Sequence, residues 1–325
     1  MSVLVAGGAG YIGSVTAKVL LESGRDVVVY DNLSRGHRQA VPAGAHFVQG
    51  ELADTEGLRR ALREHHVTCV MHFAAHSLVP ESMEKPELYF DNNVATGLRV
   101  LEAMRAEGTP HIVFSSTCAT YGTPRTLPIR EDDPQIPESV YGESKLMFER
   151  MLAWYHRIHG LRVTILRYFN ACGAYAGLGE DHQPETHLIP LVLQVPLGLR
   201  DRVSIFGTDY PTRDGTAIRD YIHIRDLARA HIAALDAPAG NGFAHYNLGN
   251  GSGYSVREVI DAARRVTGRE IPALEAPRRV GDPPELVSTT EKIARELGFA
   301  CEIPSIEDII ASAWEWHRDH PRGYA

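Results

Sequence analysis

The sequence predicts an α/β fold: a doubly wound parallel sheet, followed by a smaller C-terminal α/β domain. Two observations predict the sheet. Short β-branched runs alternate with amphipathic stretches as far as residue 167, and a glycine-rich turn follows the first run at once. A third observation predicts the second domain, because the alternation ends after residue 167 and a stretch rich in Gly, Pro and acidic residues follows at 173–186.

Short apolar or β-branched runs in the first part are expected to be strands, at residues 2–6, 26–30, 45–48, 67–73, 111–115 and 163–167. Amphipathic stretches between them are expected to be helices, at residues 12–23, 56–65, 89–106 and 141–159. Strands that alternate with helices form a parallel sheet covered on both faces. Ligands of such sheets bind at the carboxyl ends of the strands, so we expect the functional site there.

The second part contains shorter elements. We expect helices near residues 188–199, 226–235, 256–267, 291–297 and 306–316, and strands at 203–206 and 245–248. The chain then divides into a first domain over residues 1–169 and a second over residues 170–325. Residues of about 218–237 are expected to return to the first sheet, because α/β chains of this kind often interleave.

Charge and composition argue against several classes of protein. The 325 residues carry a formal net charge of -8 and basic residues cluster only in pairs, so neither nucleic acid nor an anionic membrane is an expected partner. No apolar run approaches the roughly 18 residues that span a bilayer, and the N-terminus lacks the basic region of a signal peptide. The four cysteines fit neither a disulfide framework nor zinc, so a cytoplasmic location is expected.

The turn after the first expected strand has the spacing of a dinucleotide-binding loop. Gly7, Gly10 and Gly13 form a G-x-x-G-x-x-G pattern, which allows a tight turn and a close approach of backbone to a pyrophosphate. The next helix would offer its first N–H groups to the phosphates. Asp31 ends the next strand, where a carboxylate accepts ribose hydrogen bonds and repels the 2′-phosphate of NADP. The alternative is a glycine-rich turn with an incidental aspartate, but the strand–turn–helix context favours an NAD site of the Rossmann type.

A second motif, Tyr141-x-x-x-Lys145, lies on an expected helix, where positions i and i+4 share a face. A phenol is a poor base at neutral pH, and a neighbouring ammonium lowers its pKa by favouring the phenolate. Thr117 follows an expected strand, where its hydroxyl can hydrogen-bond the same substrate oxygen as Tyr141. The alternative is a surface tyrosine beside a helix lysine. Lysine occurs only four times in this chain, which favours a catalytic role for Lys145.

Both motifs belong to a longer series of matches. Together with HFAA at 72–75, DNN at 91–93 and SST at 115–117, they resemble the extended short-chain dehydrogenase/reductase family. Motifs of the second half resemble the UDP-glucose 4-epimerases within that family, namely YFN at 168–170, HLIP at 187–190, IFGTDYPTRDGTAIRDYIHIRDLA at 205–228, YNLGNG at 246–251 and APRRVGD at 276–282. The resemblance extends from residue 3 to about residue 324.

The resemblance implies an activity, a cofactor and an assembly. It implies an NAD-dependent enzyme that interconverts UDP-glucose and UDP-galactose by hydride transfer at C4 through a 4-keto intermediate, with UDP-N-acetylhexosamines as further candidate substrates. It also implies that the second domain binds the UDP-sugar and that a homodimer forms through the helices near 89–106 and 139–159. Tyr141, Lys145 and Thr117 are the catalytic residues by this resemblance.

The resemblance also assigns the binding residues. For NAD they are Gly7, Gly10, Tyr11, Ile12, Gly13, Asp31, Asn32, Glu51, Leu52, Phe73, Ala74, Ala75, Asn93, Ser115, Tyr141, Lys145 and Tyr168. For the UDP-sugar they are Thr117, Tyr141, Asn170, His187, Leu188, Phe206, Arg219, Tyr221, Arg279, Asp282 and Leu286. No metal is expected, because His72 and His76 have no third ligand at metal spacing.

Several positions depart from the family pattern or separate its activities. Glu51 stands where Asp is more frequent near the adenine, and Ser77 where many relatives have Lys near the cofactor. The alternative functions are a 4,6-dehydratase and a UDP-glucuronate decarboxylase, which carry acids where Cys118 and Ala119 stand here. A non-catalytic NAD sensor often lacks the motif Tyr or Lys, and both are present. Leu286 has no aromatic ring, which favours room for an N-acetyl group.

Overall fold

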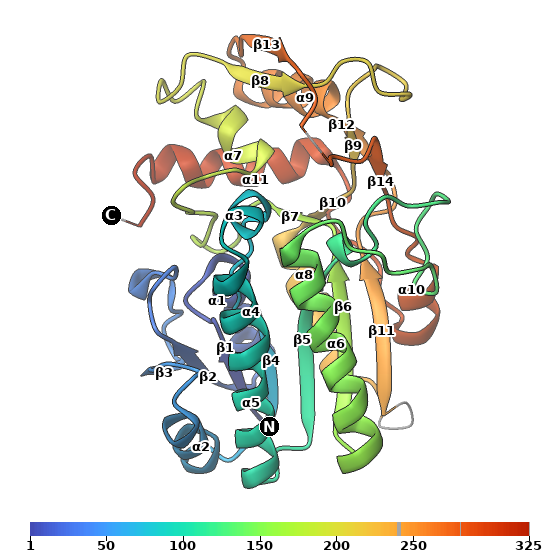
Figure 1. Ribbon diagram of the computed structural model, residues 1–325. Helices are drawn as coiled ribbons and strands as arrows, with labels where there is room; N and C mark the ends of the chain where they lie inside the picture. Colours follow the sequence, from blue (N-terminus) through green and yellow to red (C-terminus); the bar gives the residue numbers. More distant parts are fainter. Residues whose placement is uncertain (239–241, 280, 325) are drawn as a thin grey trace.

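A seven-stranded parallel sheet forms the larger layer of the protein (Figure 1). The computed structural model describes residues 1–238, 242–279 and 281–324. The strands lie in the order β11-β6-β5-β4-β1-β2-β3, and neighbouring strands are parallel. Their bounds are β1 Ser2–Ala6, β2 Asp26–Asp31, β3 His46–Gln49, β4 Val67–His72, β5 His111–Thr117, β6 Arg162–Tyr168 and β11 Phe243–Leu248. The predicted fold class, a doubly wound sheet with a smaller α/β part, is confirmed.

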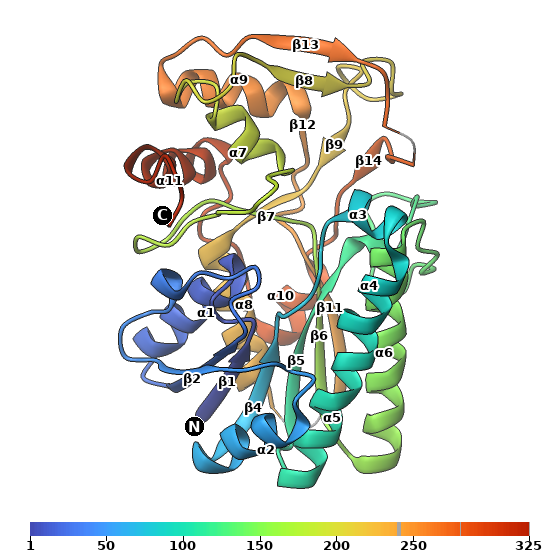
Figure 2. The ribbon, with the colours of Figure 1, turned by 60° about the vertical axis from the view of Figure 1, so that its left-hand side comes forward.

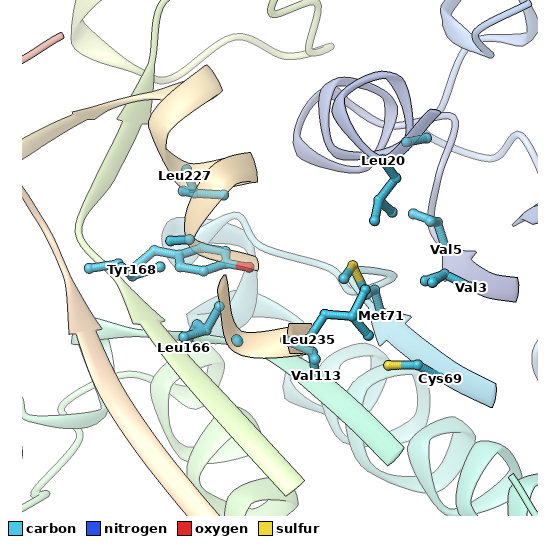
Figure 3. Packing of buried hydrophobic residues seen from close by; sticks show 14 of the residues in the cluster. Val3, Val5, Leu20, Cys69, Met71, Val113, Leu166, Tyr168, Leu227 and Leu235 are labelled. Carbon is cyan, nitrogen blue, oxygen red and sulfur yellow. The ribbon is translucent and has the colours of Figure 1, made fainter. Parts of the chain in front are cut away.

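Helices cover both faces of this sheet (Figures 1 and 2). On one face lie α1 Tyr11–Glu22, α8 Ile224–Asp236 and α10 Glu291–Leu297. On the other face lie α2 Thr55–Glu64, α5 Thr96–Glu107 and α6 Val140–His159. Figure 3 shows Leu20 of α1 and Leu227 of α8 on the same side of the sheet as Val5, Met71 and Val113. The apolar runs of the inner strands, such as β1 and β5, are continuous because both faces of these strands are buried in this way.

The helix predicted at 89–106 is interrupted in the structure. A short helix, α3 Val79–Glu84, is followed by α4 Pro86–Phe90, a π-helical turn at Asp91–Ala95, and α5. A π turn is wider than an α-helical turn and turns the following side chains away from the α-helical register. It places Asn93 in the protein interior, where the side chain is buried.

The smaller layer has its own apolar core, formed around α7, α9 and α11 (Figure 2). Its elements are β7 Asn170–Cys172, α7 Leu188–Leu193, β8 Val203–Phe206, β9 Ile218–Arg219, β10 Tyr221–His223, β12 Tyr254–Ser255, α9 Val256–Thr267, β13 Ala273–Ala276, β14 Glu285–Leu286 and α11 Ile306–Asp319. α7 ends earlier than the predicted residue 199, because Pro196 has no N–H for a helical hydrogen bond and Gly198 has a φ of 75°. Within the described residues, none of the helices combines the length and the apolar composition needed to cross a bilayer.

After residue 169 the chain returns to the large sheet three times. α8 packs beside α1, β11 pairs with β6 as the outermost strand, and α10 packs on the same face of the sheet as α8. The sequence analysis expected the first return, at about 218–237, but grouped residues 245–248 with the second domain. The structure corrects this grouping, because the pattern of a short strand does not reveal which sheet the strand joins. The division of the chain at residue 169 stays a prediction.

Candidate active site

A cavity of about 560 Å³ lies at the carboxyl ends of the large sheet, where the smaller layer meets it. Its position agrees with the expected position of a ligand on a doubly wound sheet. It is lined by most of the residues predicted to form the site: Gly7, Gly10, Tyr11, Ile12, Gly13, Asp31, Asn32, Glu51, Leu52, Phe73, Ala74, Ala75, Ser115, Thr117, Tyr141, Lys145, Tyr168, Asn170, His187, Arg279 and Leu286. One continuous cavity therefore joins the glycine-rich turn to the Tyr141 and Lys145 pair.

The glycine-rich turn leaves no room for side chains at two of its positions. Gly7 has a φ of 79°, and a Cβ there would lie 2.6 Å from the backbone nitrogen of Ala74. A Cβ on Gly13 would lie 2.2 Å from the carbonyl oxygen of Gly7. α1 begins directly after Gly10, which makes no side-chain cap hydrogen bond. The first N–H groups of α1 therefore suit a phosphate ligand, and the turn fits the pyrophosphate of a dinucleotide.

The Asp31 carboxylate holds the turn in place as well as facing the cavity. Its two oxygens accept hydrogen bonds from the backbone N–H groups of Ala9, at 2.9 Å, and Leu33, at 2.8 Å. Next to it, the Asn32 amide donates to the Glu51 carboxylate at 3.0 Å. The contact with Ala9, which no sequence pattern predicts, ties the glycine-rich turn to β2, while the predicted contact of the acid with a ribose stays a prediction.

Three side chains meet at the centre of the cavity. Thr117 ends β5, and α6 supplies Tyr141 in its first turn and Lys145 one turn later. The Ser139 hydroxyl accepts a hydrogen bond from Gly142 N–H and so caps the start of α6. The Lys145 ammonium donates to the carbonyl oxygen of Ser115 at 2.8 Å, which anchors it to β5. The predicted i, i+4 arrangement on one helix face is present.

Burial shifts the pKa values of the two titratable side chains among these three, Tyr141 and Lys145. It raises the pKa of Tyr141 to about 12, although the Thr117 hydroxyl acts in the opposite direction. Burial also lowers the pKa of Lys145 to about 7, against the attraction of Glu149. The lysine was expected to lower the pKa of the tyrosine; in this structure burial raises that pKa instead, because it disfavours the charged phenolate.

Tyr168 reaches the cavity from the end of β6 and has a partner that sequence analysis missed. Its hydroxyl hydrogen-bonds Nε2 of His231 on α8, whose Nδ1 lies 2.9 Å from the Leu227 carbonyl oxygen. A carbonyl only accepts, so Nδ1 carries the proton and Nε2 accepts from Tyr168. Nothing in the local sequence around residue 231 indicates this contact, because 63 residues separate the two side chains.

Asn93 lies behind the cavity wall and does not line it. Its amide oxygen accepts from His76 N–H at 2.9 Å, and its amide nitrogen donates to the His76 carbonyl oxygen and to Ser144, each at 3.0 Å. Asn93 therefore shapes the wall at His76, and its predicted contact with a cofactor stays a prediction. His72 is buried as well and packs against the Phe114 and Phe148 rings.

Several residues predicted to hold the substrate are paired with each other. The Arg219 guanidinium hydrogen-bonds the Asp282 carboxylate and the Pro283 carbonyl oxygen. The Arg279 guanidinium lies 4.2 Å from the centre of the Phe206 ring. The predicted residues that do not line the cavity are Leu188, Phe206, Arg219, Tyr221 and Asp282. Arg219 thus contacts Asp282 and Arg279 contacts Phe206, while the binding of substrate by these residues stays a prediction.

The sequence profile described as "NAD dependent epimerase/dehydratase family" matches residues 3–249. The chain belongs to this family. The similarity continues beyond the matched region, because the UDP-glucose 4-epimerase of Lacticaseibacillus casei is 50% identical over 327 residues, which cover 100% of this chain and 99% of that protein.

Solved structures of other epimerases have the same fold. UDP-glucose 4-epimerase from Brucella ovis in complex with NAD has a TM-score of 0.93 and 45% identity, over 97% of both chains. UDP-glucose 4-epimerase from Bifidobacterium longum in complex with NAD+ and UDP has a TM-score of 0.95 and 38% identity, over 100% of both chains.

Four side chains that could bind a metal ion cluster at the cavity, namely Glu180, His182, Glu185 and His187. Their potential metal-binding atoms lie within 4.8 Å of one another. Metal ligands in a tetrahedral site lie about 3.4 Å apart. His187 Nδ1 lies only 2.6 Å from a Glu180 oxygen, a separation that fits a shared proton. Glu180 and Glu185 accordingly raise the pKa of His187 to about 10. The cluster is a charged hydrogen-bond network.

Proposed function

We propose that the protein is an NAD-dependent UDP-glucose 4-epimerase that interconverts UDP-glucose and UDP-galactose. One observation carries the proposal: the Gly7–Gly13 turn and the Thr117, Tyr141 and Lys145 side chains line one cavity. Several relatives that match nearly the whole chain are UDP-glucose 4-epimerases, which supports the same activity here.

NAD would be held by the glycine-rich turn, the N-terminus of α1 and Asp31. NAD supplies hydride chemistry at C4 of the sugar and is regenerated in each cycle, so that a 4-keto sugar is the intermediate. Asp31 favours NAD over NADP, because its buried carboxylate would repel a 2′-phosphate. Lys145 is placed to hydrogen-bond the nicotinamide ribose from α6.

Tyr141 takes the proton of the sugar 4-hydroxyl and later returns it. Its phenol and the Thr117 hydroxyl are neighbours, so both can hydrogen-bond the same substrate oxygen. The high pKa of Tyr141 makes the phenolate costly, and the Lys145 ammonium on the same helix face supplies the stabilising positive charge.

The UDP part would be held on the side of the smaller layer. Asn170, His187 and Arg279 line the cavity there, and Arg219 and Asp282, which do not line it, are paired with each other. Guanidinium groups bind phosphate oxygens in a bidentate manner, so Arg279 suits the diphosphate. A firm hold on UDP leaves the 4-keto sugar free to turn over, as epimerisation requires.

The alternative activities are a nucleotide-sugar 4,6-dehydratase and a UDP-glucuronate decarboxylase. Both need an acid beside Thr117, and the side chains that line the cavity there are Cys118 and Ala119. Burial raises the pKa of Cys118 to about 11, so its thiol is no substitute for a carboxylic acid at neutral pH. The geometry therefore favours epimerisation.

The direct test is incubation of the purified protein with UDP-galactose, without added NAD, followed by separation of the sugar nucleotides. We expect a mixture of UDP-galactose and UDP-glucose. A 4-keto-6-deoxy product would indicate a dehydratase, and an unchanged substrate with NAD bound would contradict catalysis.

A homodimer is proposed from an exposed apolar stripe on α6. Met147, Trp154 and Ile158 are 37%, 59% and 66% exposed and lie on one face at helical spacing. Phe90 of α4 is exposed as well. Light scattering is expected to give twice the mass of the chain, and Trp154→Glu to give a monomer. Ile136→Glu, at an exposed position outside α6, is the control that keeps the dimer.

A cytoplasmic location is proposed on the basis of the cysteines. All four, each within the described part of the chain, are free thiols, as is usual in a reducing compartment. Fractionation of the native cells with an antibody against the protein tests this location.

A further inference from the structure

A buried ion pair lies directly behind the proposed active site. The Glu149 carboxylate, on α6, accepts a bidentate pair of hydrogen bonds from Arg167 on β6, at 2.8 and 3.1 Å. It also accepts from the Ser116 hydroxyl on β5, at 2.5 Å, and from the Gln135 amide at 3.1 Å. Both charged side chains are 5% exposed.

This pair connects the elements that carry the catalytic side chains. Ser116 is the residue before Thr117, and Arg167 is the residue before Tyr168. Glu149 lies one helical turn after Lys145 and two turns after Tyr141 on α6. One carboxylate thus fixes the helix that bears the Tyr and Lys against the ends of both neighbouring strands.

The stability of the fold alone does not explain why a buried ion pair is present here. Removing two charges from water costs several kcal/mol per ion, and buried ion pairs are often replaced by apolar residues without loss of stability. An apolar pair of similar volume could join α6 to β6 without that cost. The pair has to be explained by something that a charge does and an apolar residue cannot do.

The nearby Lys145 supplies that explanation. It is 3% exposed, and its nitrogen has one protein hydrogen-bond acceptor among the described residues, the Ser115 carbonyl oxygen. The groups around it are neutral: His72 from β4, whose pKa burial lowers to about 3, the Phe114 ring at 4.9 Å, and the phenol of Tyr141. Glu149 is the neighbouring anion that raises the pKa of Lys145, while burial lowers it.

We propose that Glu149 is a positioning residue of the epimerase, which keeps Lys145 charged. Through Ser116 and Arg167, Glu149 also holds the neighbouring Thr117 and Tyr168 in place relative to Tyr141. The role of Lys145 in catalysis rests on the proposed function; the charge of Lys145 does not.

The test titrates Lys145 directly. The chain has only four lysines, so protein labelled with [ε-13C]lysine gives few NMR signals, and Lys145→Arg identifies the one of interest. In Glu149→Gln we expect the titration midpoint of Lys145 to fall by about one pH unit, because an attractive charge is removed. The other three lysines are internal controls for folding. An unchanged midpoint in folded Glu149→Gln would overturn the proposal, whether or not the protein epimerises UDP-galactose.

Two further variants separate charge from structure. Ser116→Ala removes one hydrogen bond to Glu149 and keeps the charge, so it is expected to lower kcat without moving the midpoint. Glu149→Gln/Arg167→Met removes both buried charges, and it replaces Glu149→Gln if the single variant does not fold. In this double variant the titration midpoint of Lys145 is expected to stay as low as in Glu149→Gln. The alkaline limb of its pH–kcat profile is expected to move to lower pH as well. A double variant with the wild-type midpoint would contradict the proposal.

Discussion

Thr117 ends β5 with its hydroxyl beside the phenol of Tyr141, which comes from the first turn of α6. The two side chains are 24 positions apart in the sequence and meet only because β5 and α6 pack together. Their contact defines where a substrate hydroxyl can be bound by both, and it gives the first prediction.

Tyr141→Phe is expected to lower kcat by about 10²–10⁴-fold, because the phenol performs the proton transfer. The fold and the NAD content are expected to remain, since removal of one oxygen leaves the ring in place. The epimerase assay and circular dichroism check both parts. Tyr155→Phe, on the same helix and outside the cavity lining, is the matched control and should retain full activity.

The purified protein is expected to contain NAD and to work without added cofactor, because epimerisation has no net redox change and the cofactor is regenerated. Denaturation should release NAD or NADH in an amount close to one per chain, measurable by chromatography. A protein that needs stoichiometric NAD and accumulates NADH would be a dehydrogenase instead.

Gly7→Ala is expected to lower both the melting temperature and the NAD content. Its Cβ would lie 2.6 Å from the Ala74 nitrogen in a left-handed backbone conformation. Gly24→Ala is the matched control, because Gly24 has a similar φ of 76° and no atom within 4 Å of an added Cβ. That control should cost about 1–2 kcal/mol of unfolding free energy and leave NAD binding intact. Equal effects of the two variants would mean that the close approach to Ala74 has no role.

Leu286→Tyr is expected to suppress activity on UDP-N-acetylglucosamine and to spare UDP-glucose. Leu286 lines the cavity and packs with Tyr121, Ile129 and Phe169, so a larger ring there would take up space inside the cavity. The ratio of kcat/KM for the two substrates is the measurement. Leu274→Tyr, at a 49% exposed leucine of β13, should leave the ratio unchanged. Wild-type protein without activity on the acetylated sugar would refute the prediction.

Much of the fold follows from local sequence. The strand–helix alternation predicts the large sheet, and the spacing of Gly7, Gly10 and Gly13 predicts the turn at its edge. Such patterns are local, and they predict the strands up to β6 and most of the helices between them, but not α3 or the π turn before α5. The place of β11 was missed, because the same apolar run fits either sheet until the partner strand is known.

The site could be predicted less fully, because its contacts are long-range. The i, i+4 spacing of Tyr141 and Lys145 is a local signal, whereas the bond between Tyr168 and His231 depends on how α8 packs. Burial also reverses a local expectation: the ammonium of Lys145 was expected to lower the pKa of Tyr141, but the dry interior raises it. Desolvation depends on every element around a side chain, so no motif contains it.

The position of β11 has a consequence for biosynthesis. One edge of β6 pairs with β5, but its outer edge is paired only after β11 has been made, and β11 ends at residue 248 of 325. A nascent chain that stops near residue 169 therefore presents the N–H and C=O groups of β6 as an open edge. Truncated or stalled chains should be prone to pairing with other chains, and complete synthesis rather than early folding protects this protein from aggregation.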